Sequence, residues 1–107
     1  MPFLWGEVDL YSPTMESSTC TVTVTNPHGL HARPSLIITK TVRQYDAQVT
    51  VRRLNRCVKA TSILDLLSLG ASQGTELLLS ASGPQAEQAL DALAHLFDVE
   101  FEVEYKD

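Results

Sequence analysis

A histidine and an arginine lie two positions apart in the run G-L-H-A-R-P-S, residues 29–35. An unperturbed imidazole is mostly neutral at pH 7, so His31 can attack an electrophilic phosphorus and later release the group. The guanidinium of Arg33 can bind phosphate oxygens. These two residue types at this spacing are compatible with phosphoryl transfer, with His31 as the acceptor and Arg33 as its assistant. By itself, however, a lone histidine before a helix is more often a loop or capping residue.

A helix that begins beside this histidine would assist the chemistry by compensating the added negative charge. Apolar residues recur at helical spacing over 34–45, and Pro34 suits the first turn of a helix, where no N–H is needed. The start of a helix offers free N–H groups and the positive end of a dipole, so we expect the backbone at Ala32 to bind phosphate. Gly29 removes side-chain bulk where a partner must approach.

The remaining elements predict an α+β fold. Strands are expected over 20–25, 47–52, 57–60 and 76–81, and helices over 34–45, 63–69 and 85–97. The second helix has a Thr61-Ser62 cap and Gly70 behind it. The order β-α-β-β-α-β-α favours a sandwich with the helices on one face of the sheet. The last helix would turn one stripe to the core: Ala86, Ala89, Leu90, Leu93 and Phe97.

Both ends of the chain fall outside this pattern. We expect an N-terminal extension (1–19), a central domain (20–98) and a C-terminal extension (99–107). Acidic and apolar residues alternate over 99–105, which favours a strand added to a sheet edge over a frayed tail. For the N-terminal extension both readings stay open.

Composition bounds the function. The 107 residues are 44% hydrophobic and 20% charged, as expected for one packed domain, and the net charge of -5 argues against nucleic acid as a partner. No segment is apolar for long enough to insert into a membrane, and the acidic N-terminus does not resemble a secretion signal, so we expect a cytoplasmic protein. Two cysteines are too few for a disulfide framework or a zinc site. No metal or other cofactor is expected, since a His28/His31 pair has no further candidate ligands nearby.

The run at 29–35 resembles the phosphorylation motif of HPr, the histidine-containing phosphocarrier of the bacterial phosphoenolpyruvate-dependent phosphotransferase system. The segment T-S-I-L-D-L-L-S-L-G-A-S-Q-G-T, residues 61–75, resembles the second signature of that family, and the resemblance covers about residues 21–98. It implies an open-faced sandwich with four antiparallel strands in the order 1-4-2-3 and three helices on one side. Cys20 and Cys57 would then lie on opposite edge strands and form no disulfide.

The resemblance also implies a function. His31 would accept phosphate on Nδ1 from phosphorylated enzyme I and pass it to an enzyme IIA domain in sugar uptake, as a stoichiometric carrier and not as an enzyme. Alternatives are a regulatory or nitrogen-branch carrier, whose phosphorylation state signals to partners, and a carrier domain of a multidomain protein. An interaction module that has lost phosphate cycling is a further alternative, against which the intact His31 and Arg33 argue.

A docking surface is expected beside the acceptor. Lys40 and Arg43 follow Arg33 at helical spacing and would form a basic rim on one face, unless this face is merely solvated. Such a surface suits acidic partner clefts and speeds encounter. Its apolar part would come from the short second helix, although Leu67 could instead face the core: Ile63, Leu64 and Leu67.

Ser62 stands where many family members from Gram-positive bacteria carry a serine that a dedicated kinase phosphorylates. Those members usually have glycine three residues later, where this chain has Asp65, whose carboxylate would repel an added phosphate. The cap of the second helix accounts for Ser62 by itself. His28 is interpreted as a loop residue.

Overall fold

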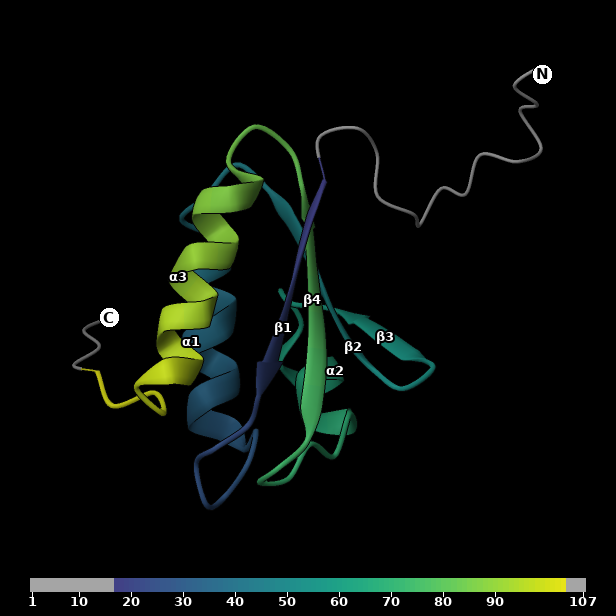
Figure 1. The fold of residues 1–107 in the computed structure, drawn as a ribbon, viewed down its shortest axis with the longest axis vertical. Helices are drawn as coiled ribbons and strands as arrows, with labels where there is room; N and C mark the ends of the chain where they lie inside the picture. Colours follow the sequence, from purple (N-terminus) through teal and green to yellow (C-terminus); the bar gives the residue numbers. More distant parts are fainter. Residues whose placement is uncertain (1–16, 104–107) are drawn as a thin grey trace.

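The computed structural model describes residues 17–103. In chain order the elements are β1 (Ser18–Thr23), α1 (Ala32–Val42), β2 (Gln48–Arg53), β3 (Arg56–Lys59), α2 (Ile63–Ser68), β4 (Glu76–Ser82) and α3 (Ala86–Asp98). The four strands are antiparallel and lie in the order β1-β4-β2-β3, with the helices packed on one face (Figure 1). The predicted open-faced α+β sandwich is confirmed.

The core lies between the helices and the sheet face to which alternate apolar residues point. On β4, Leu77 and Leu79 are almost fully buried, and Leu79 lies opposite Val51 of β2. α3 packs over β1 and β4 and against α1. Its buried stripe contains every residue that the spacing predicted, each at most 4% exposed: Ala86, Ala89, Leu90, Leu93 and Phe97.

Element boundaries differ modestly from the predictions. α1 begins two residues earlier and ends three residues earlier than expected. It ends because the N–H groups of Gln44 and Tyr45 donate to carbonyls three residues back, which tightens the backbone beyond the α-helix. The other boundaries move by one or two residues, and β1 starts at Ser18.

The C-terminal strand predicted over 99–105 is wrong for the part that the structure describes. Residues 99–103 form a turn beyond α3 and extend no sheet. The remaining residues of that prediction, 104–105, lie outside the described part of the chain, as does most of the expected N-terminal extension, 1–16.

Burial of one aromatic side chain explains the turn. Phe101 is 1% exposed, and its ring meets that of Phe97 edge to face with centroids 4.9 Å apart. The N–H of Phe101 donates to the carbonyl of Leu96 (2.8 Å), which brings the chain back over the end of α3. Glu100 and Phe101 adopt positive φ angles of 55° and 61°. Packing on the helix therefore overrides the alternating pattern.

The cysteines lie on opposite edges of the sheet, as the resemblance implied. Cys20 is on β1 and Cys57 is on β3, and both are free thiols. Among residues 17–103, no helix has the length and apolar character needed to cross a membrane.

Candidate functional site

The loop between β1 and α1 forms the platform of the site, at the lower end of the molecule in Figure 1. Within it, Asn26 and Gly29 are joined twice: the N–H of Gly29 donates to Asn26 O (3.0 Å), and Asn26 Nδ2 donates to Gly29 O (2.6 Å). The N–H of Leu30 donates to Ala71 O (2.9 Å) in the connection between α2 and β4. These bonds fix the backbone that leads into the acceptor residue.

Gly29 is required by this geometry for two reasons. Its φ is +68°, a backbone conformation that residues other than glycine rarely adopt. A Cβ atom would also collide with the carbonyl oxygen of Ala71 and crowd Ser72. The glycine therefore lets two backbone segments touch. The access for partners expected at Gly29 is wrong, because the residue is buried and this chain's own backbone occupies the space beside it.

His31 is the N-cap residue of α1 but does not cap it with its side chain. Its backbone is extended (φ -90°, ψ -164°), and its carbonyl accepts the first helical hydrogen bond from Ser35 N–H (3.1 Å). The exposed ring is therefore left for chemistry. The N–H groups of Ala32 and Arg33 precede that first helical bond, so they belong to the end of the helix that attracts anions.

Arg33 contacts a part of the chain that sequence reasoning did not connect to the site. One terminal nitrogen, Nη1, donates to Phe101 O (2.8 Å), and Nη2 donates to Val103 O (2.9 Å). The turn after α3 thus holds the guanidinium at the start of α1. No glycine or asparagine in 99–103 signals this turn, and the alternating acidic residues favoured a strand.

His28 also belongs to the site, although the sequence suggested only a loop residue. Its ring centroid lies 5.7 Å from that of His31, with the two planes at 85°. Both rings are exposed. The structure therefore brings a second imidazole to the candidate acceptor.

α2 presents the expected apolar side chains beside a capped N-terminus. Leu64 is 78% exposed and Leu67 is 38% exposed, so Leu67 faces solvent and not the core, while Ile63 is half-buried. The Ser62 hydroxyl accepts the N–H of Asp65 (3.2 Å), which confirms the predicted cap.

Arg43, the C-cap residue of α1, connects this helix to the start of α2. Arg43 is exposed and donates from Nη2 to Thr61 O (3.5 Å), which links the end of α1 to the start of α2. Lys40 is half-buried one turn earlier. The structure thus places the predicted basic and apolar groups on neighbouring helices.

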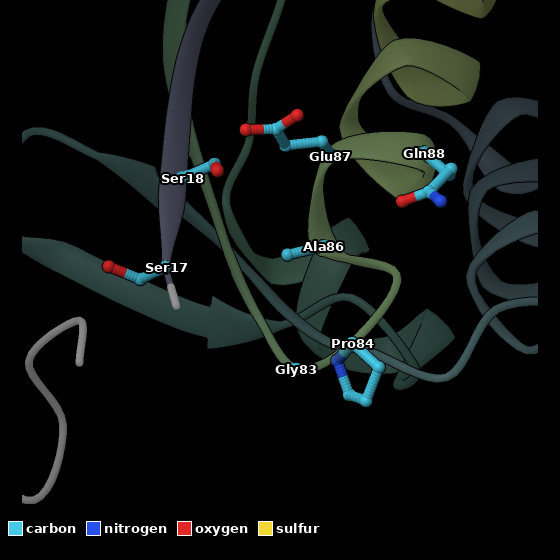
Figure 2. A pocket seen from close by; sticks show the side chains of 7 residues that line it. All are labelled: Ser17, Ser18, Gly83, Pro84, Ala86, Glu87 and Gln88. Atoms are coloured by element: carbon cyan, nitrogen blue, oxygen red, sulfur yellow. The ribbon is translucent and has the colours of Figure 1, made fainter. Parts of the chain in front are cut away.

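An open hollow at the other end of β1 is a poor alternative site (Figure 2). It lies where β1 and α3 begin and is lined by Ser17, Ser18, Gly83, Pro84, Ala86, Glu87 and Gln88. None of the candidate site residues lines it. Within residues 17–103, no group of three or more His, Cys, Asp or Glu side chains is arranged to hold a metal ion.

Comparison with known families decides the assignment. The family model described as the phosphorylation site of the HPr component of the phosphotransferase system matches residues 18–98. The chain belongs to the HPr family. Members of this family are phosphocarriers of the phosphotransferase system and work with its enzymes; they are not themselves catalysts.

Curated HPr-family relatives are moderately similar. The phosphocarrier protein HPr of Vibrio cholerae is 38% identical over 77 residues (72% of this chain, 91% of the relative). The phosphocarrier protein NPr of Escherichia coli K12 is 36% identical over 83 residues (77% and 92%). The multiphosphoryl transfer protein of Haemophilus influenzae is 38% identical over 78 residues, and there the match spans only 16% of the relative.

A solved HPr structure shares the fold. The crystal structure of HPr-C-His from Thermoanaerobacter tengcongensis superimposes with a TM-score of 0.77 at 38% identity, and it covers 82% of this chain and 99% of that one.

Proposed function

We propose that this chain carries a phosphoryl group on His31 in the sugar branch of the phosphotransferase system. The observation that carries the proposal is the exposed His31 ring, which stands at the N-terminus of α1 unused by capping, with Arg33 two residues on. The helix end and the guanidinium both favour the added negative charge.

The step needs no cofactor and no net proton transfer. The Nδ1 lone pair of neutral His31 attacks the phosphorus of a phosphohistidine on enzyme I, and the phosphorus–nitrogen bond of the donor breaks. The electron pair of that bond returns to the donor ring, which is protonated at its other nitrogen and becomes neutral. The His31 ring keeps its Nε2–H and takes over the positive charge. The reverse sequence of bond changes passes the group to an enzyme IIA domain, so the chain is regenerated as a stoichiometric carrier.

Partner docking is assigned to the surface formed by Leu64 and Leu67 with Lys40 and Arg43. An exposed apolar pair next to a basic rim suits a partner cleft with acidic edges. The half-buried Ile63 supports the apolar pair from the start of α2.

The deciding experiment is transfer from phosphoenolpyruvate through enzyme I. We expect one acid-labile phosphate per chain, located on His31 by mass spectrometry and ³¹P NMR, and none on His31→Ala. His95→Ala is the matched control because it removes an exposed imidazole from α3. Labelling of His31→Ala, or no labelling of the wild type, would contradict the carrier role and leave an interaction module.

A nitrogen-branch or regulatory carrier is the second candidate, favoured by the similarity to NPr proteins. The two branches use the same step and differ in the acceptor. Phosphorylated chain offered to enzyme IIA domains from both branches should transfer faster to the sugar-branch domain. The match to multiphosphoryl transfer proteins also keeps open that the carrier works within a longer protein.

Phosphorylation of Ser62 by a serine kinase stays a prediction. The Ser62 hydroxyl already accepts the N–H of Asp65, and the Asp65 carboxylate would oppose a phosphate there. Incubation with such a kinase should label Asp65→Gly more readily than the wild type, as measured by intact mass.

A further inference from the structure

The proposed transfer step leaves the side chain of His28 without a role. Its ring lies edge to face with the ring of His31, with centroids 5.7 Å apart. A group bound to His31 therefore has a second ionisable imidazole as its neighbour.

The loop keeps the backbone under the two rings in place. Asn26 and Gly29, on either side of His28, are joined by two hydrogen bonds, and the N–H of His31 donates to Gly29 O (3.0 Å). Leu30 is tied to Ala71 on the neighbouring connection. The closeness of the two imidazoles is thus built into the fold of the loop, and both can act on the same bound group.

The charges near His31 leave room for a second cation to stabilise a bound phosphoryl group. The phosphoryl oxygens bring about 1.5 to 2 negative charges, which the His31 ring itself offsets only in part. The guanidinium of Arg33 already donates to the carbonyls of Phe101 and Val103, and the carboxylates of Glu100 and Glu102 lie on that same turn. The neighbouring stretches 24–27 and 69–75 carry no ionisable side chain.

We propose that His28 compensates the charge of the phosphoryl group on His31 and thereby makes the phosphorylation equilibrium of this chain depend on pH. The inference rests on the proposed function, since it requires phosphate on His31. On phosphorylation His28 binds its proton more tightly, so that at intermediate pH it takes up a fraction of a proton from water, and its imidazolium attracts the phosphoryl group across the short gap. Histidine is suited to this because its charge changes between pH 5 and 8.

The direction of the effect follows from linkage. A proton that the phosphorylated form holds more tightly stabilises that form at low pH, where His28 is charged. The gain is lost as the pH rises and the ring becomes neutral. Charges about 6 Å apart in a solvent-exposed site should change the equilibrium constant by about fivefold.

The test compares four proteins in equilibrium with enzyme I and phosphoenolpyruvate at pH 6.0 and pH 8.5: wild type, His28→Asn, His28→Lys and His95→Asn. Because the donor is common to all, its own pH dependence cancels in the ratios. The equilibrium constant for phosphorylation of the wild type should exceed that of His28→Asn by about fivefold at pH 6.0, and the two constants should be equal at pH 8.5. His28→Lys, a permanent cation, should keep the gain at both values, and His95→Asn should behave as wild type.

The outcomes separate this inference from the carrier function. If His31 is labelled but the ratio of wild type to His28→Asn is the same at both pH values, the His28 proposal is wrong and the carrier stands. If His31 is not labelled, both are wrong. His28 is exposed, so the variants should unfold at the wild-type temperature, and failure of His28→Lys to raise the constant at pH 8.5 also overturns the proposal.

Discussion

Arg33 lies beside the candidate acceptor and also contacts the turn after α3. Its position two residues after His31 suits it to a phosphoryl group, while its terminal nitrogens bond the carbonyls of Phe101 and Val103. The guanidinium makes these contacts with two separate nitrogens of its planar fork, a geometry that the single nitrogen of an ammonium does not reproduce. A substitution here should therefore affect both transfer and the turn after α3.

Arg33→Ala should slow transfer to His31 by about 10- to 100-fold, since a charge-assisted contact to phosphate is lost. It should lower the free energy of unfolding by only about 1 kcal/mol, because the lost bonds are partly solvated. Rapid-quench labelling and urea titration measure the two effects. Arg33→Lys should transfer at an intermediate rate, and an Arg33→Ala protein that does not fold would show that the arginine is chiefly structural.

At the residue scale, the Ser62 cap was predicted from a short motif and is confirmed. The structure places His31, exposed, at the start of α1 as expected, while its role as phosphate acceptor stays a prediction. The partners of Arg33 could not be predicted in this way, because they lie 68 and 70 residues away along the chain. The approach of the His28 ring to His31 also depends on how the loop folds against Ala71, which no local pattern reveals.

Among the elements, the loop before α1 and the connection after α2 depend on one another. Gly29 fits only because it has no side chain where Ala71 approaches, whereas Gly70 has a similar φ, +63°, and open space around it. The two glycines therefore form a natural pair that separates steric collision from backbone strain.

Gly70→Ala should cost about 1 kcal/mol of unfolding free energy, from the left-handed backbone alone. Gly29→Ala should cost that amount plus about 1 to 3 kcal/mol, because a backbone segment must shift to admit the methyl group. Urea unfolding of both variants measures the difference. Equal losses of unfolding free energy in the two variants would mean that the loop before α1 is not in close contact with the connection after α2.

The fold itself was predictable because the spacing of apolar residues in each strand and helix shows which side of that element is buried. Alternation in β4 and the stripe of α3 gave the right elements in the right order. The turn at 99–103 was missed because its pattern is that of a strand, and the contact between Phe101 and Phe97 that decides the matter is tertiary.

At the scale of the whole molecule, charge is strongly segregated along the chain. Seven of the eight lysines and arginines lie in 33–59, where Asp46 is the only acidic residue. The other twelve of the thirteen acidic residues lie elsewhere. The chain is acidic overall, yet it presents its cations on α1 and on the β2–β3 side of the sheet, which should steer acidic partners toward the docking surface.

Lys40→Gln should lower the association rate with an enzyme IIA domain by about two- to fivefold at low ionic strength, and the difference should vanish near 0.5 M salt. Lys59→Gln is the matched control, since alternation along β3 turns Lys59 away from the helices and it removes the same charge. Stopped-flow measurements of both variants check the prediction. An effect of Lys59→Gln as large as that of Lys40→Gln would place the docking surface elsewhere.

The turn after α3 also determines where a reporter can be attached. Val103 O bonds Arg33, so position 103 lies at the phosphoacceptor end, whereas Ser17 precedes β1 at the opposite end (Figure 1). A fluorophore on Val103→Cys, with Cys20 and Cys57 replaced by serine, would sense the guanidinium and the arrival of phosphate. The same dye on Ser17→Cys would leave the docking surface clear and serve for binding measurements.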